Sequence, residues 1–205
     1  MNARRIVIAD TETVTLDAST GLIWEIGLLD RTPKGDVEYL WHLRPDLTDA
    51  DPGSVRFSDY YNRCAVADRD PGTAMVIEHP KLAKGKRQVT QSRKVAFEVA
   101  KLIAGAVLVG AVPDFDSRMF TAWLRSHKEC NAAHYHLQDV ETLVWGYLLG
   151  LRAAGLDVDM PPLPLKSDAL SLALGIDPAL FKRHKALGDC YWVRAQLDKV
   201  LGGAS

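Results

Sequence analysis

The sequence lacks the features that mark disulfide-bonded or membrane-inserted proteins. Its three cysteines, Cys64, Cys130 and Cys190, are odd in number, widely separated and not in a CxxC pattern. This pattern predicts reduced thiols in a cytoplasmic protein rather than a disulfide framework or a zinc site. The N-terminal apolar run is short and ends at Asp10, which excludes a signal peptide and a membrane span. We therefore expect no membrane partner.

An excess of charge of one sign is also missing, because the formal net charge is −1. A protein that passively coats nucleic acid neutralises phosphates over much of its surface, and this composition disfavours that class. With 205 residues, 47% of them hydrophobic, the chain is long enough to bury one good core. We find no internal repeat, and we expect a single domain over residues 1–205.

Apolar runs bounded by turn residues predict five strands. The first three are joined by short turns, which indicates an antiparallel meander. The fourth, AVLVGA, is apolar throughout, as in a strand buried on both faces. The predicted strands cover residues 4–10, 22–29, 37–43, 106–111 and 135–138.

Helical spacing of apolar residues predicts helices over residues 91–104, 115–127, 140–153, 167–174 and 186–201. Asp114 is the expected N-cap of the second helix and Ser167 that of the fourth. Residues 45–90 contain many turn signals and little periodicity, so we expect an irregular insertion with short helices. Together these elements predict an α/β fold, a mixed five-stranded sheet flanked by helices.

Two carboxylates follow the first predicted strand. Asp10 and Glu12 are two residues apart on an extended chain, so their side chains point to the same side. Two carboxylates on the same side repel each other unless a cation lies between them. The alternative is an ordinary turn after a strand, where Asp and Thr are common.

A third carboxylate, Asp116, follows the fourth predicted strand. It lies in the first turn of the next helix, near the strand end at which open α/β sheets bind ligands. The helix dipole also favours an acid at this place, so a purely structural role stays open.

The last predicted helix begins with HKALGDC, which contains His184 and Asp189. Asp189 is expected to face inward among apolar neighbours, and such an acid needs a metal or a basic partner. His184 lies in the basic run FKRHK, and an imidazole near neutral pH suits the deprotonation of water.

These residues, taken together, resemble the DEDDh family of 3′→5′ exonucleases. The family motifs appear in order as DTET, VPDFD and HKALGDC, and WEIGLL matches the family's second strand. The resemblance covers nearly the whole chain. It implies a ribonuclease H-like fold and two divalent cations, Mg²⁺ or Mn²⁺, consistent with hard oxygen ligands and no cysteine cluster.

The resemblance also implies a role for each residue. Asp10 would bridge both metals, Glu12 and Asp189 would complete one site, and Asp116 would hold the other metal, partly through water. The metals would stabilise the attacking and leaving oxygens. His184 would take a proton from the attacking water.

Three further positions bear on the substrate. Thr13 matches the family position that meets the 3′-terminal nucleotide, and Leu16 is expected to be an apolar wedge against the terminal base. The family usually has Asn four residues before the second-motif Asp, whereas this chain has Val112. This departure puts substrate preference and rate in doubt, but not metal binding.

Two other groups are weaker candidates. The basic run over residues 81–94 could hold the substrate backbone, with Lys84, Lys86 and Arg87 as candidates, or it could be a solvated loop. His134 and His136 alternate along a strand, but without a matching third ligand we interpret them as surface histidines.

The sequence therefore predicts a metal-dependent 3′→5′ exonuclease that acts on single-stranded 3′ ends and releases nucleoside 5′-monophosphates. DNA is favoured over RNA as the substrate. The alternatives are an RNA-trimming enzyme, a catalytically silent adaptor and a ribonuclease H-like endonuclease. Because little sequence follows the last predicted helix, a stand-alone enzyme is expected.

Overall fold

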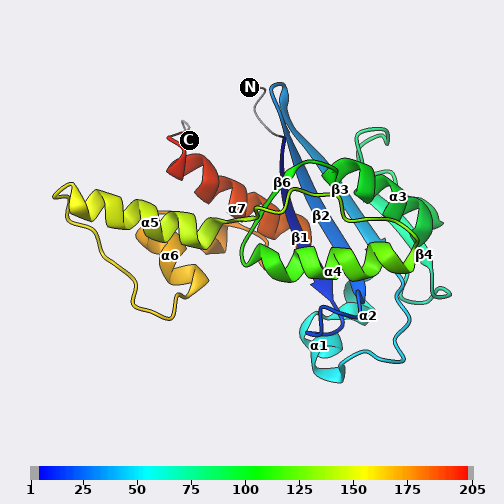
Figure 1. The fold of residues 1–205 in the computed structure, drawn as a ribbon. Helices are drawn as coiled ribbons and strands as arrows, with labels where there is room; N and C mark the ends of the chain where they lie inside the picture. The colour runs from blue at the N-terminus through cyan, green and yellow to red at the C-terminus, as the bar shows by residue number, and fades with distance from the viewer. Residues whose placement is uncertain (1–4, 203–205) are drawn as a thin grey trace.

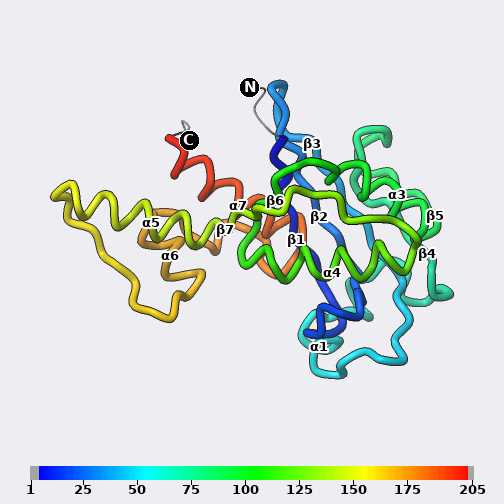
Figure 2. The backbone as a smooth tube through the Cα atoms, viewed as in Figure 1, coloured from blue at the N-terminus to red at the C-terminus, as the bar shows by residue number. Residues whose placement is uncertain are grey.

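The computed structural model describes residues 5–202 and contains one mixed sheet with helices on both faces (Figure 1). The sheet has seven strands in the order β5-β4-β3-β2-β1-β6-β7, and Figure 2 traces the two edge strands. From β1 to β5, each strand pairs antiparallel with the strand that follows it in the sequence. β6 pairs parallel with β1, and β7 pairs parallel with β6. The strands are β1 (Ile6–Thr13), β2 (Ile23–Thr32), β3 (Gly35–Leu43), β4 (Thr73–Glu78), β5 (Gln88–Gln91), β6 (Val107–Gly110) and β7 (Gln138–Asp139).

The predicted α/β class, a mixed sheet flanked by helices, is confirmed, but the predicted number of five strands is wrong. The first four predicted strands are β1, β2, β3 and β6; Arg4, in the first prediction, lies outside the described residues. The fifth, predicted over residues 135–138, shares only Gln138 with β7. The two additional strands, β4 and β5, form a hairpin on the outer edge of the meander. They were missed because β5 is polar and largely exposed, so it shows no hydrophobic alternation. Residues 45–90 thus add two strands as well as short helices.

Seven of the eight helical segments among the described residues are α-helices or single α-turns. α3 and α4 lie on one face of the sheet, and α7 lies on the other, with α5 and α6 beside it (Figure 1). Their bounds are α1 (Pro52–Phe57), α2 (Tyr60–Arg63), α3 (Ser92–Ile103), α4 (Pro113–Ser126), α5 (Val140–Ala153), α6 (Ser167–Ala173), the 3₁₀ turn η1 (Pro178–Leu180) and α7 (Ala186–Val200).

Two predicted helix caps are wrong, although the helices themselves are present. The N-cap of α4 is Val112, and Asp114 lies inside the first turn, where it pairs with Arg118 at 2.9 Å. The N-cap of α6 is Lys166, so Ser167 is its first helical residue. Pro113 explains the earlier start of α4, because a proline favours the first helical position.

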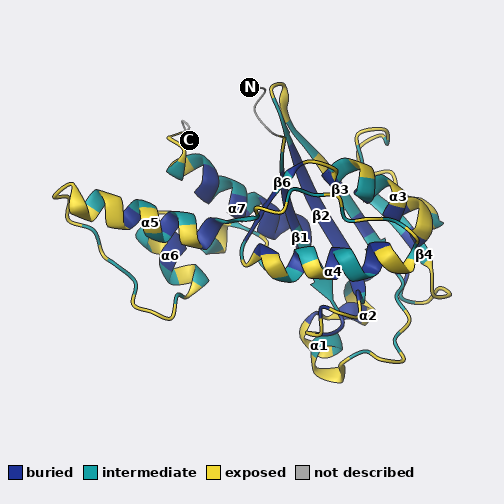
Figure 3. Cartoon of the chain, in the orientation of Figure 1, coloured by how far each residue is buried: buried dark blue, intermediate teal, exposed yellow. Residues whose placement is uncertain are grey.

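The central strands are the most buried part of the molecule (Figure 3). Eight consecutive residues of β2 are buried, because helices cover both faces of the sheet at this strand. Two glycines allow the close fit of α7. A Cβ on Gly27 would lie 2.6 Å from the Ala186 carbonyl carbon, and one on Gly188 would lie 2.0 Å from the Lys182 oxygen. The first turn of α7 therefore rests directly on β2, beside the end of β1.

No helix in residues 5–202 is long and apolar enough to cross a membrane.

Candidate metal-dependent active site

A cleft of about 550 Å³ lies where β1 ends, between α1 and the start of α7. β1 contributes an acidic floor through Asp10 and Glu12, and α7 contributes Asp189. Thr13 and Leu16, the two predicted substrate contacts on this segment, also line the cleft. The cleft therefore brings together residues from both ends of the sequence.

Asp10, Glu12 and Asp189 form a compact carboxylate group. One oxygen of each lies within 4.8 Å of the others, and no further group of three or more potential ligands occurs in residues 5–202. Asp10 and Glu12 lie on the same side of β1, as their spacing predicted. Asp189 reaches them because Gly27, the partner of Asp10 in the β1–β2 register, lets α7 approach the sheet.

The electrostatics of this group favour a bound cation. Burial and the neighbouring carboxylates, first among them Asp116, raise the pKa of Asp10 well above its usual value. Burial raises the pKa of Glu12 to about 8, Arg63 opposes this rise, and Glu25 and Asp189 add to it. A divalent cation would relieve both the repulsion and the desolvation cost. The donor set, carboxylate oxygens without sulfur or imidazole, suits a hard ion.

Asp116 is buried and does not line the cleft, but it is bonded to Thr11, which does. Its Oδ1 accepts hydrogen bonds from the Thr11 amide at 2.9 Å and the Thr11 hydroxyl at 2.6 Å. Burial raises its pKa to about 7, although the two Thr11 hydrogen bonds oppose the rise. Asp116 raises the pKa of Asp10 but is not one of the three clustered ligands. In this arrangement its carboxylate is held by Thr11 beside the cluster.

The inward acid Asp189 has the basic partner that its burial requires. Its Oδ1 accepts a hydrogen bond from Nε of Arg183, and its Oδ2 accepts one from the His184 amide at 2.7 Å. Arg183 also pairs with Asp168 at 3.1 Å and lies over the Trp192 ring at 3.7 Å. Arg183 was not singled out in the sequence, where it is one of several cations in FKRHK.

His184 is exposed at the rim of the cleft, next to an exposed aromatic ring. Its backbone is left-handed, with φ 59°, which turns the chain sharply into α7. The Phe57 ring of α1 meets the imidazole edge to face, with 5.6 Å between the ring centres. The Phe57 side chain is 79% exposed and Leu16 is 81% exposed, so two apolar groups border an acidic cleft. Phe57 could not be found from the sequence, because residues 45–90 show no periodicity.

Val112, at the position where the resembled family usually has Asn, also lines the cleft. Its backbone conformation is one that suits Asn better than Val. Its φ is 56°, in the left-handed region that Asn tolerates and a β-branched residue disfavours. The Val112 amide donates to Oδ1 of Asp139 at 3.3 Å, which anchors the turn between β6 and α4. The Val112 side chain is 58% exposed.

A further carboxylate in the cleft was missed by sequence reasoning. Glu141, in the first turn of α5, is 7% exposed, lines the cleft, and its Oε1 has no hydrogen-bond partner. The sequence predicted only a helix over residues 140–153, and an acid in a first helical turn is common because the helix dipole favours it.

The remaining candidates lie away from the cleft. Lys84 and Lys86 are exposed on the β4–β5 connection. Arg87 lines a separate hollow with Lys182 and Lys185. The predicted strand position of His134 and His136 is wrong, because both lie in the loop before β7. Their ring centres are 5.4 Å apart, and they belong to no three-ligand group among the described residues.

Comparison with known proteins gives one consistent result. No family model and no curated protein matches the sequence. Among solved structures, Escherichia coli exonuclease I in complex with a 5cy-dA13 oligonucleotide matches with a TM-score of 0.62 and 15% identity, over 97% of this chain and 40% of that chain. The fold is similar to that of exonuclease I.

Two more exonuclease I structures agree. A product-bound form has a TM-score of 0.64 and 14% identity, over 98% of this chain and 44% of that chain. A zinc-bound E. coli exonuclease I–single-stranded DNA complex has a TM-score of 0.63 and 16% identity, over 98% and 41%. This chain thus spans about two fifths of the exonuclease I chains, and at this identity the likeness establishes the fold.

Proposed function

We propose that this protein is a metal-dependent 3′→5′ exonuclease that removes nucleoside 5′-monophosphates from single-stranded ends, with DNA favoured over RNA. The observation that carries the proposal is the Asp10–Glu12–Asp189 group at the floor of a cleft bordered by exposed apolar side chains. The likeness to exonuclease I, solved with single-stranded oligonucleotides, supports the same class of substrate. We also propose that residues 1–205 act as one catalytic domain.

Asp10, Glu12 and Asp189 would hold divalent cations, Mg²⁺ or Mn²⁺, with Asp116 close behind. When bound, the cations would neutralise charge on the scissile phosphate and on the attacking and leaving oxygens. Thr11 holds the Asp116 carboxylate at a fixed place, and Arg183 holds that of Asp189. The residues therefore present negative charge in a preorganised array, to which a cation binds with little rearrangement.

His184 is proposed to accept the proton of the attacking water. Its imidazole is exposed at the cleft rim, while its backbone is fixed by the hydrogen bond to Asp189. Leu16 and Phe57 are proposed to contact the terminal bases, because exposed apolar and aromatic groups stack on bases of any sequence. Thr13 also lines the cleft and is proposed to contact the terminal nucleotide.

The test is digestion of 5′-labelled DNA and RNA oligomers of matched sequence, with Mg²⁺, Mn²⁺ or EDTA. We expect stepwise shortening that requires the metal and is absent from the Asp10→Ala variant. A faster reaction on RNA would reverse the substrate preference, and equal inactivity of both proteins on both polymers would favour the adaptor alternative.

A further inference from the structure

Two glutamates face each other across the strands that form the site. Glu12 on β1 is the register partner of Glu25 on β2, immediately before a bulge in the pairing. The two side chains are 13% and 6% exposed. Like charges directly opposite one another destabilise an antiparallel pair, most of all where water is largely excluded. A buried cation at this place relieves the repulsion between ionised forms of the two groups, independently of any metal.

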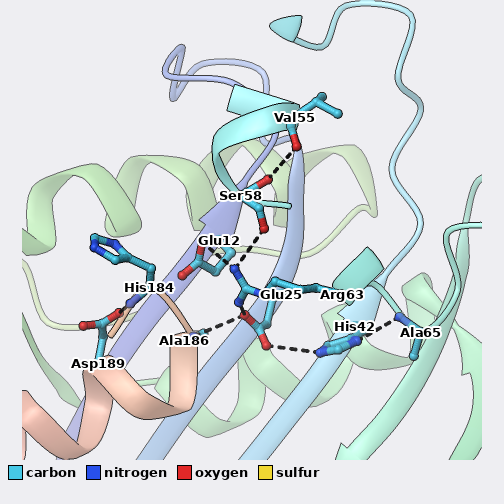
Figure 4. Close-up of polar contacts among 10 residues, drawn as sticks. All are labelled: Glu12, Glu25, His42, Val55, Ser58, Arg63, Ala65, His184, Ala186 and Asp189. Carbon is cyan, nitrogen blue, oxygen red and sulfur yellow. Dashed lines mark hydrogen bonds and ion pairs between the residues drawn. The ribbon is translucent and has the colours of Figure 1, made fainter. Parts of the chain in front are cut away.

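Arg63 is that cation, and it comes from the segment whose sequence was least legible. It is the last residue of α2, and its Nη2 lies 2.8 Å from Oε2 of Glu25. Its Nη1 lies 3.9 Å from Oε2 of Glu12 and donates to the Ser58 carbonyl at 2.9 Å (Figure 4). The guanidinium also lies over the Trp24 ring, 4.8 Å from its centre. These contacts fix both its position and its orientation.

Glu25 extends the connection to the start of α7. The Ala186 amide, the first of the helix, donates to Oε2 of Glu25 at 3.2 Å. On the other side, His42 Nε2 lies 3.1 Å from Oε1 of Glu25. His42 Nδ1 accepts a hydrogen bond from the Ala65 amide, so Nε2 carries the proton and donates. Each hydrogen bond to the Glu25 carboxylate thus comes from a donor, namely Arg63, the Ala186 amide or His42 (Figure 4).

We propose that Arg63, held by Glu25, is a positioning residue that orients the Glu12 carboxylate toward Asp10 and Asp189. The same ion pair ties the 45–90 segment, β1, β2 and the start of α7 into one unit, so the insertion builds part of the site. A role for Glu12 as a metal ligand comes from the proposed function, on which this inference rests. The contacts that define the unit are independent of the reaction.

The test compares Arg63→Ala with Arg63→Lys, and uses Arg56→Ala as a matched control. Arg56 lies in the same insertion but is exposed. Mn²⁺ binding is measured by calorimetry, and folding by circular dichroism. Partners that orient a ligand typically change metal affinity or activity by about 10- to 100-fold when removed. We expect a loss of this size in Arg63→Ala, partial recovery in Arg63→Lys, and wild-type binding in Arg56→Ala.

A folded Arg63→Ala protein that binds Mn²⁺ as tightly as the wild type, or more tightly, would overturn the inference and leave Arg63 a purely structural residue. If Arg63→Ala does not fold, Glu25→Gln supplies the second test. The glutamine places an NH₂ group among donors, so it should loosen Arg63 and weaken Mn²⁺ binding; unchanged binding would also overturn the inference.

The failure of the proposed function can be recognised separately. If the wild-type protein binds Mn²⁺ but cleaves no oligomer, the exonuclease proposal fails while the Arg63 comparison still decides the inference. If the wild-type protein cleaves oligomers, kcat and KM on a short oligomer add a second readout. We then expect Arg63→Ala to lower kcat more than it raises KM, because Arg63 does not line the cleft.

Discussion

Replacing Glu12 by glutamine should stabilise the protein in EDTA, and the gain should grow as the pH rises. Burial raises the pKa of Glu12 from 4.5 to about 8. The folded state therefore binds this proton more tightly than the unfolded chain does. The stabilisation from the protonated group is fully present below about pH 4.5 and is lost as the pH rises through 8. Glutamine has no proton to lose.

The magnitude follows from the shift. One pKa unit corresponds to about 1.4 kcal/mol, so a shift from 4.5 to about 8 gives a total loss of about 5 kcal/mol. Most of it, about 3 kcal/mol, falls between pH 5 and pH 8. Urea unfolding of the wild type and Glu12→Gln in EDTA at pH 5, 6, 7 and 8 measures the difference, with Glu129→Gln, outside the cleft, as the control.

The expected result is a wild-type free energy of unfolding that falls with pH relative to Glu12→Gln, while Glu129→Gln follows the wild type. Added Mn²⁺ should restore the wild type at pH 8 and have a smaller effect on Glu12→Gln, since a cation needs the ionised ligand. Parallel pH profiles of the wild type and Glu12→Gln would refute the reasoning, because they would show that ionised Glu12 is not disfavoured in the folded state.

Three further predictions address other parts of the site. His184→Ala should keep Mn²⁺ binding while turnover falls by about 10²–10⁴-fold, the usual effect of losing a positioned base; calorimetry showing lost Mn²⁺ binding would make His184 a ligand instead. Val112→Asn should raise the free energy of unfolding by about 1 kcal/mol, because Asn accepts the left-handed backbone that strains Val; urea unfolding showing no gain would contradict this explanation. Replacing Lys84, Lys86 and Arg87 together by alanine should weaken the binding of long oligomers and flatten the salt dependence of that binding, with little effect on dinucleotide cleavage. An unchanged salt slope would show that the basic run over residues 81–94 is a solvated loop.

The sequence predicted the helices and the central strands well, because these segments have a clear period. β1, β6 and α5 lie within a few residues of their predicted bounds. β5 was missed because it is short, polar and mostly exposed. β4 was missed because its consecutive apolar residues are almost all half-buried and show no alternation. The start of α4 was also predicted wrongly. The N-cap is Val112, with a positive φ, so the helix begins before Asp114, the N-cap that the sequence predicted.

For the site, the sequence predicted which acids approach one another but not what holds them. The spacing of Asp10 and Glu12 on a strand fixed their common side, and the structure adds Asp189 to the same group. The arginines that partner these acids could not be predicted. In the sequence, nothing distinguishes Arg183 and Arg63 from arginines on the surface. Only the tertiary fold brings Arg183 to Asp189 and Arg63 to Glu25.

The decisive measurement identifies the products released from a single-stranded DNA oligomer labelled at its 3′ end, in Mn²⁺. We expect the label to appear at once as a nucleoside 5′-monophosphate, before the rest of the strand shortens, and the Asp10→Ala variant to release none. Labelled fragments of several nucleotides would instead show internal cleavage, and no release at any metal concentration would show no nuclease activity; either result would refute the exonuclease proposal.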